Sequence, residues 1–151
     1  MNGYQSCRRG CGLNISDNNI EKSLIIIKPD GVKQKIIGEI ISRFERGDLI
    51  IEKLKMIKID QELACKHYCD HKDKDFFKVL IKYITSGPVV VMVVSGVDAI
   101  SKARELMGPT DSKKAETGTI RGDFGTDITV NVVHGSDSKE SAKREMKLFF
   151  N

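Results

Sequence analysis

The chain has 151 residues, of which 40% are hydrophobic and 30% are charged, with a formal net charge of +4. This length and composition are typical of one globular domain. No apolar run reaches the roughly 20 residues that cross a membrane, and the start lacks the apolar core of a signal peptide. We therefore expect a cytoplasmic protein with no membrane partner. The mild positive charge favours a polyanionic ligand. Because the basic residues are dispersed, nucleic acid is not expected as the main partner.

The first 22 residues are rich in Asn, Gly and Ser and show no apolar period. They predict a flexible N-terminal extension, 1–22, ahead of a single domain, 23–151. Two of the four cysteines, Cys7 and Cys11, lie in this extension, and the others are Cys65 and Cys69. Free thiols in a reducing cytosol are the favoured interpretation. A zinc site made by all four thiolates is the alternative, although their spacing is unusual for zinc.

The first half of the domain begins with a β-branched run at 24–27, which predicts a buried strand. Pro29-Asp30-Gly31 predicts a turn. A helix follows, because apolar residues recur at its one-face spacing at Ile37, Ile40, Ile41 and Phe44. Residues 50–59 predict a second strand.

Two short helices should come next, one capped by Asp60 and one by Asp75. The apolar stripe of the second is formed by Phe77, Leu80, Ile81 and Ile84. After Gly87-Pro88, the apolar run 89–94 is typical of a central strand covered on both faces. Asp98 should cap a further helix, which ends at Gly108-Pro109.

Residues 109–127 predict a long loop, and loops of that length in compact domains are usually functional or disordered. Residues 128–133 predict the last strand. Asp137, with Glu140 three residues later, resembles a capping box for a final helix. The order of elements predicts an α/β (α+β) fold: a ferredoxin-like, antiparallel four-stranded sheet covered by helices, with an inserted helical pair.

His134 has the best context for chemistry among the three histidines, because it ends a predicted strand beside Gly135. A neutral imidazole is a competent nucleophile at pH 7 when its second nitrogen is held by a hydrogen bond. Glu145, on the final helix, is a candidate for that orienting carboxylate.

Phosphate chemistry is indicated by residues that flank or lie within the long loop, namely Arg104, Thr110 and Arg121, which together can form a phosphate clamp. Lys28 ends the first strand and is a candidate point charge for an oxyanion. Neither a Walker A motif nor the protein-kinase signature is present. A nucleotide must therefore be held in another way.

An aromatic residue outside an apolar stripe can stack on a nucleobase. Phe76 falls outside the stripe that contains Phe77, and packing on a neighbour is an equal alternative for it. Tyr68 and His71 share one face of the preceding helix, so they can point together into a site.

Three segments resemble nucleoside diphosphate kinases: Ile-Lys-Pro-Asp-Gly-Val at 27–32, Gly-Thr-Ile-Arg-Gly-Asp-Phe at 118–124 and Asn-Val-Val-His-Gly-Ser-Asp-Ser at 131–138. The resemblance runs in register from Ser23 to Phe150. It implies transfer of the γ-phosphoryl group from a nucleoside triphosphate to a nucleoside diphosphate by a ping-pong mechanism through a phosphohistidine at His134.

The resemblance also implies a role for each matching residue. His134 would attack through Nδ1, with Glu145 and Ser136 holding the ring and Tyr68 packed close by. Lys28 and Asn131 would bind the sugar hydroxyls. Further matches are the phosphate contacts His71, Arg104, Thr110 and Arg121 and the base clamp of Phe76 and Ile128. Mg²⁺ would ride on the nucleotide phosphates, with Asp137 nearby through water.

Partners implied by the resemblance are nucleoside di- and triphosphates and further copies of the chain in a homohexamer, with a tetramer as the alternative. Two other functional classes remain open. One is a non-enzymatic ferredoxin-like binding or regulatory module, since fold does not fix function. The other is a nucleic-acid-binding protein, which would show a steep salt dependence and no phosphorylated intermediate.

Overall fold

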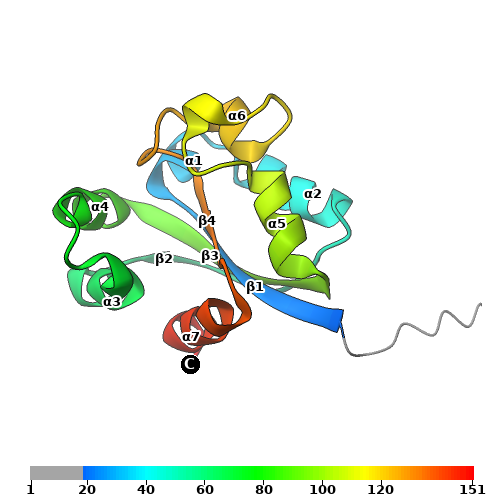
Figure 1. The fold of residues 1–151 in the computed structure, drawn as a ribbon, viewed down its shortest axis with the longest axis horizontal. Helices are drawn as coiled ribbons and strands as arrows, with labels where there is room; N and C mark the ends of the chain where they lie inside the picture. Colours follow the sequence, from blue (N-terminus) through cyan, green and yellow to red (C-terminus); the bar gives the residue numbers. More distant parts are fainter. Residues whose placement is uncertain (1–18) are drawn as a thin grey trace, which may run out of the picture.

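The computed structural model of the protein describes residues 19–151. Its four strands form one antiparallel sheet in the order β2-β3-β1-β4 (Figure 1). The elements in chain order are β1 (Ile20–Ile27), α1 (Pro29–Lys33), α2 (Ile37–Arg46), β2 (Ile50–Lys58), α3 (Gln61–His67), α4 (Phe77–Ile84), β3 (Pro88–Val97), α5 (Ala99–Met107), α6 (Ile120–Phe124), β4 (Val133–Gly135) and α7 (Lys139–Phe149), with 3-10 turns at Cys69–His71 and Ser112–Lys114. The predicted ferredoxin-like fold is confirmed, and α3 and α4 are its inserted helical pair.

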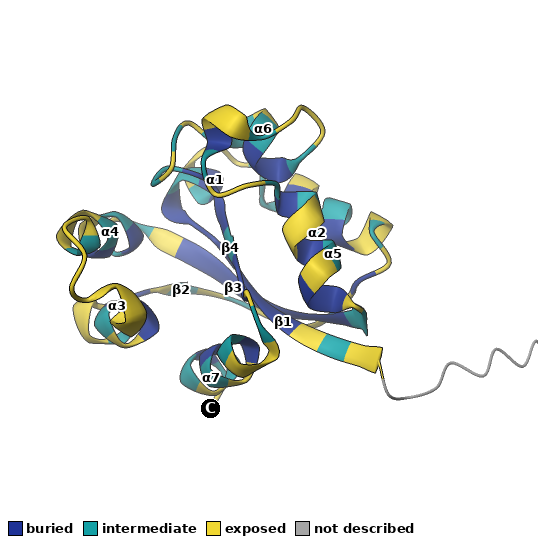
Figure 2. Cartoon of the chain, in the orientation of Figure 1, coloured by how far each residue is buried: buried dark blue, intermediate teal, exposed yellow. Residues whose placement is uncertain are grey.

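The sheet carries a hydrophobic core on each face, because successive residues of a strand point to opposite sides. Ile25 and Ile27 of β1 pack on one side with residues of α2 and α5. Leu24 and Ile26 pack on the other side with residues of α3, α4 and α7. Figures 1 and 2 show these two helical layers, with the buried central strands between them. The predicted central strand is β3, which lies between β1 and β2.

Strand β1 begins at Ile20, three residues before the predicted start of the domain. Ile20 pairs with Val97, and Asn19 donates a hydrogen bond to the Asp98 side chain (2.9 Å). The predictions that concern residues 1–18, including the cysteines there, lie outside the described residues. Cys65 and Cys69 are free thiols.

Several local predictions were wrong at the ends of helices. Pro29-Asp30-Gly31 begins helix α1 instead of a turn, because proline fits the first turn of a helix, where its missing N–H is not needed. Asp75 does not cap α4, and Asp98 precedes α5 at a positive φ of 52° without a capping bond. Ser138, not Asp137, caps α7 by accepting a hydrogen bond from the Ser141 N–H (3.1 Å). The predicted Asp60 cap of α3 is present.

The predicted strand 128–133 is mostly irregular, and β4 comprises only Val133–Gly135. The Asp127 carboxylate accepts hydrogen bonds from the N–H groups of Thr129 and Val130 (2.7 Å each). Asn131 donates to the Ile128 carbonyl (3.0 Å). These local bonds replace a strand ladder.

The predicted loop 109–127 contains α6, which Thr119 caps by accepting a hydrogen bond from the Gly122 N–H (3.0 Å). This short helix fixes the position of Arg121. Within residues 19–151, no helix is long and apolar enough to span a membrane.

Candidate active site

A cavity of about 400 Å³ opens between the helical pair α3–α4, the 108–131 segment and the end of β4. It is lined by twelve of the thirteen predicted site residues, namely Lys28, Tyr68, His71, Phe76, Arg104, Thr110, Arg121, Ile128, Asn131, His134, Asp137 and Glu145. The thirteenth, Ser136, is fully buried behind Glu145. Residues more than 100 positions apart in the sequence therefore meet in one cavity.

His134 lies at the centre of β4, where its backbone pairs with Ile26 of β1. Its Nε2 is 3.0 Å from Oε1 of Glu145, which projects from α7. The other oxygen, Oε2, accepts a hydrogen bond of 2.6 Å from the Ser136 hydroxyl. Ser136 is itself anchored, because its Oγ accepts a hydrogen bond from the Leu24 N–H (3.0 Å). A carboxylate at Nε2 selects the tautomer that carries its proton there. Nδ1, which bonds to none of the described residues, then keeps its lone pair.

His67 packs against His134. Its sequence context predicted no role for it. The two rings meet edge to face with centroids 4.6 Å apart, and Nδ1 of His67 is 4.0 Å from Oε1 of Glu145. His67 is buried, and neither ring nitrogen has a hydrogen-bond partner among the described residues. Burial, followed by the charges of His134 and Arg144, places the pKa of His67 well below its usual value. It is therefore neutral at pH 7.

Tyr68 also lines the cavity. It is buried, its ring is 6.4 Å from that of His134, and its hydroxyl has no partner among the described residues. Burial first, and then the charge of Glu145, raise the pKa of Tyr68. The hydroxyl therefore keeps its proton and can serve as a donor to a ligand.

Lys28 follows the last residue of β1 and is buried, with its Nζ donating to Oδ1 of Asn131 (2.6 Å). Burial and the nearby Arg121 lower the pKa of Lys28 to about 7, and Asp30 opposes this. Asn131 donates its own amide to the Thr110 carbonyl (2.9 Å). The pair thus connects the end of β1 to the 108–131 segment.

Two arginines from different elements supply positive charge. Arg121 of α6 is buried and donates to the carbonyls of Gly108 and Val133 (2.9 Å each), while its Nε has no partner among the described residues. Burial, followed by repulsion from Arg104, lowers the pKa of Arg121 to about 10. It is still charged at pH 7.

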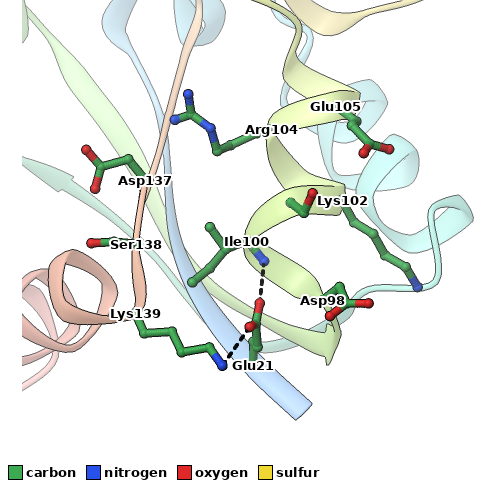
Figure 3. Close-up of a pocket in the computed structure, with 10 residues that line it drawn as sticks. Glu21, Asp98, Ile100, Lys102, Arg104, Glu105, Asp137, Ser138 and Lys139 are labelled. Carbon is green, nitrogen blue, oxygen red and sulfur yellow. Dashed lines mark hydrogen bonds and ion pairs between the residues drawn. The ribbon is translucent and has the colours of Figure 1, made fainter. Parts of the chain in front are cut away.

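Arg104 projects from α5 toward the segment that carries Asp137, as Figure 3 shows. Both residues line the cavity and also an adjacent open groove of about 600 Å³. At the far end of that groove, Glu21 accepts from Lys139 (2.9 Å) and from the Ile100 N–H (3.4 Å). Hydrogen bonds from Ser141 and Ser138 and the charge of Arg104 lower the pKa of Asp137, against the effect of burial. Asp137 is therefore an ionised carboxylate on the cavity wall.

Two apolar side chains stand at the open end of the cavity. Phe76, which precedes α4, is 50% exposed, and Ile128 is 62% exposed. The Phe76 ring centroid lies 5.7 Å from that of His71. Apolar groups exposed in this way on a cavity rim are suited to hold a flat aromatic ligand.

Three potential metal-ligand atoms, one each from His67, His134 and Glu145, lie within 4.8 Å of one another, the only such group in the described part of the chain. The 3.0 Å contact between His134 and Glu145 is a hydrogen-bond distance. With Oε2 also bonded to Ser136, the geometry favours a carboxylate that orients an imidazole.

Arg144, the residue before Glu145, was also missed by the sequence analysis. It pairs with Asp70 (3.0 Å) and donates to the His67 carbonyl (3.4 Å), which joins α7 to the turn after α3. Neither its position nor its neighbours in the sequence carry a signal for this role, because the contact spans more than 70 residues.

The family model described as nucleoside diphosphate kinase matches residues 21–151. The nucleoside diphosphate kinase of Pyrococcus abyssi is 58% identical over 137 residues, which cover 89% of this chain and 86% of that protein. That of Pelotomaculum thermopropionicum is 56% identical, with 87% and 88% covered.

Solved structures give the same result. The Aquifex aeolicus nucleoside diphosphate kinase superposes with a TM-score of 0.85 at 41% identity, covering 87% of this chain and 96% of that one. The Halobacterium salinarum enzyme, solved in complex with CDP, gives a TM-score of 0.84 at 47% identity, with 87% and 88% covered. The chain therefore belongs to the nucleoside diphosphate kinase family, phosphotransferases that act by a ping-pong mechanism through a phosphohistidine.

Proposed function

We propose that His134 is the residue of this chain that carries the phosphoryl group. The observation that supports it is the hydrogen-bonded series Ser136–Glu145–His134, which holds Nε2 and leaves Nδ1 without a partner among the described residues. Nδ1 attacks the γ-phosphorus of a nucleoside triphosphate, so an N–P bond forms and the bond from the γ-phosphorus to the β,γ-bridging oxygen breaks. The diphosphate leaves, and a terminal oxygen of a second nucleoside diphosphate then attacks the phosphorus and releases His134.

Lys28, Arg104 and Arg121 stabilise the charge on the transferring group, because phosphoryl transfer depends mainly on positioning and electrostatics. Thr110 and His71 contact the other phosphates, and the protonated Tyr68 packs with its ring centroid 6.4 Å from that of His134. The low exposure of Lys28 and Arg121 supports this role, since a charge acts more strongly where water is excluded.

The nucleoside is held by shape and by few polar contacts. Lys28 and Asn131 bind the sugar hydroxyls, and the base lies between Phe76 and Ile128. Every base presents a π-face to such a clamp, so ATP, GTP and other nucleotides are accepted with similar ease.

The metal ion of this reaction is Mg²⁺, bound mainly by the nucleotide phosphates. The cavity fits that arrangement, because Asp137 offers an ionised carboxylate at its wall, while the other two lining carboxylates are already bonded, Asp70 to Arg144 and Glu145 to His134 and Ser136. Asp137 would hold the ion through water, and the ion would neutralise phosphate charge when bound.

The working form is a homohexamer in the cytoplasm, with no nucleic acid as main partner. An association surface is supported by strand β2, an edge of the sheet that exposes Ile50 (67%), Leu54 (49%) and Met56 (55%). An apolar edge strand is a ready template for pairing with another chain. Measurement of the molar mass in solution by light scattering distinguishes a hexamer from a tetramer.

Incubation with γ-labelled ATP and Mg²⁺ tests the nucleophile. The parent protein should become labelled in a form that is labile in acid and stable in alkali, as expected for a phosphohistidine. His134→Ala should keep the fold and lose both the label and the phosphotransfer. His71→Ala, the matched control, should still be labelled at saturating nucleotide. Undiminished labelling of a folded His134→Ala protein would refute the assignment.

A further inference from the structure

A strained turn lies directly before β4, the strand that carries His134. Val132 is fully buried and has a φ of +72°, although it is β-branched. The Val133 N–H donates to the Asn131 carbonyl (2.8 Å), which closes a three-residue γ-turn. The form of this turn with positive φ at its central residue is the rare and strained one. A β-branched residue is among the least suited to it, so surrounding groups must hold the turn in place.

Both backbone groups of Val132 are held by residues that follow β1. The Val132 carbonyl accepts from the Lys28 N–H (2.7 Å), and the Val132 N–H donates to Oδ2 of Asp30 (3.0 Å). The second oxygen of Asp30 accepts a hydrogen bond from the Tyr83 hydroxyl. Asp30 and Tyr83 therefore form a brace, running from α4 through α1 to the strained turn.

The brace depends on the close approach of α1 to the turn. A Cβ at Gly31 would lie 2.8 Å from Cγ2 of Ile27 and 3.1 Å from Cγ1 of Val132. Glycine at this position lets the Asp30 carboxylate reach the Val132 N–H.

The turn separates two residues of the site. Asn131 precedes Val132, and its side chain accepts the hydrogen bond of Lys28. His134 comes two residues after Val132 and projects from β4. A change in the turn would therefore move the Lys28–Asn131 pair relative to His134. Tyr83 adds a second connection, because it belongs to α4, the helix that follows Phe76.

We propose that Asp30 and Tyr83 are positioning residues for phosphoryl transfer, which hold the γ-turn at Val132 and thereby set Asn131 and Lys28 against His134. They touch neither the nucleotide nor the phosphoryl group in this scheme. The proposal rests on the site assignments given above. It differs from a role in stability alone, because it predicts that rate and stability can be changed in opposite directions.

Asp30→Ala removes the acceptor of the Val132 N–H, and Tyr83→Phe removes only the hydroxyl that orients Asp30. We expect Asp30→Ala to lower kcat on the order of 10- to 100-fold, the effect of a misplaced site, and to change KM less. Tyr83→Phe should give a smaller loss. Asp30→Asn should stay within about threefold of the parent, because its amide can accept from Val132 and donate to Tyr83. Ser86→Ala is the matched control and should leave kcat unchanged, because among the described residues its hydroxyl bonds to the Tyr83 carbonyl alone.

The decisive variant is Val132→Gly in the Asp30→Ala background. Glycine adopts positive φ without steric cost, so the turn no longer needs the carboxylate. The double variant should have a higher kcat than Asp30→Ala and a lower melting temperature, because a buried side chain is lost. A role in stability alone predicts that both quantities fall together.

Single-turnover labelling with γ-labelled ATP and melting by circular dichroism measure these effects. An unchanged kcat in folded Asp30→Ala, or no gain of rate from Val132→Gly together with no rescue by Asp30→Asn, would overturn the brace. The site assignment is tested separately by His134→Ala. If His134→Ala is still labelled, the site assignment fails. If His134→Ala is not labelled but Asp30→Ala is fully active, only the proposal about Asp30 and Tyr83 is refuted.

Discussion

The Lys28 side chain is buried in the folded protein even without a bound ligand. With a pKa of about 7, it is largely neutral above that pH in the free protein. A bound polyphosphate favours the charged form and raises the pKa again. In the unfolded chain Lys28 has the ordinary value of 10.5, so the unfolded state binds more protons between about pH 7 and 10.5. Stability without nucleotide should therefore rise with pH across that window.

The same argument predicts how nucleotide binding depends on pH. Mg·ADP should bind with uptake of a proton at pH 8, and its affinity should weaken as pH rises above about 7 by up to about tenfold per unit, the limit for one proton. Calorimetry in buffers of different ionisation enthalpy measures the uptake. In Lys28→Gln both the uptake and this pH dependence should disappear. Equal proton uptake by the parent and the variant would show that another group titrates.

At the level of single residues, the sequence indicated those with a distinctive local context. His134 follows the predicted strand 128–133 beside a glycine, and Arg121 lies in a segment without apolar periodicity, so both could be proposed as candidates. Ser136 and Asn131 came from the family resemblance alone, whereas Tyr68 was also indicated by the helix face that it shares with His71. His67 could not be predicted, because a histidine one turn after the buried Ala64 has the pattern of an ordinary core position. His67 belongs to the site because β4 brings the His134 ring into contact with it, and the sequence pattern does not reveal that contact.

Two adjacent aromatic residues at the start of α4 have different surroundings. Phe76 is half exposed and lines the cavity, whereas Phe77 packs against the core beneath the sheet. Phe77 is only half-buried, so Phe77→Ala should cost somewhat less than the ~3–5 kcal/mol of a fully buried phenylalanine. Phe76→Ala should mainly raise KM, because it removes base stacking worth about 1–3 kcal/mol.

Urea denaturation and steady-state kinetics of the two alanine variants separate these effects. Lys78→Ala, an exposed change one residue further along α4, serves as the control for helix propensity. Equal losses of stability in the two phenylalanine variants, without a difference in KM, would mean that the faces are wrongly assigned.

Among the elements, the predictions succeeded where side-chain periodicity decides and failed where side chains bond to the backbone. The helix α2 and the buried β3 follow directly from their apolar spacing. The segment 128–132 has the composition of a strand, but Asp127 and Asn131 bind its backbone groups and leave it irregular. Pro29 likewise starts a helix where the sequence suggested a turn. Local polar bonds of this kind depend on geometry that composition does not encode.

For the whole molecule, the order of elements was enough to predict the fold class, and the two apolar faces of the strands explain why helices cover both sides of the sheet. We propose that residues 1–18 form an extension and that the catalytic domain begins near Ile20. The ladder of β1 supports this boundary, because Ile20, Glu21 and Lys22 pair with Val97, Gly96 and Ser95.

Two truncations test that boundary. Deletion of residues 1–18 should leave kcat, the melting temperature and the molar mass nearly unchanged, because the proposed site residues all lie from Lys28 onward. Deletion of residues 1–22 should also spare kcat but lower stability, since it removes three ladder positions and the ion pairs of Lys22 with Glu52 (2.6 Å) and Glu21 with Lys139 (2.9 Å). We expect a loss on the order of 2 kcal/mol, from hydrogen bonds worth about 1 kcal/mol each and exposed ion pairs worth less.

The rival interpretation joins Cys7 and Cys11 to Cys65 and Cys69 in a four-thiolate zinc site. Removal of residues 1–18 would release the metal from such a site. It would also lower the stability of the protein, because structural zinc contributes directly to folding. Metal analysis of the full chain and the shorter truncation decides between the two. Stoichiometric zinc in the full chain, lost together with several degrees of melting temperature in the truncation, would make the extension a structural part of the domain. Absence of zinc with equal melting temperatures would support a domain that folds without it.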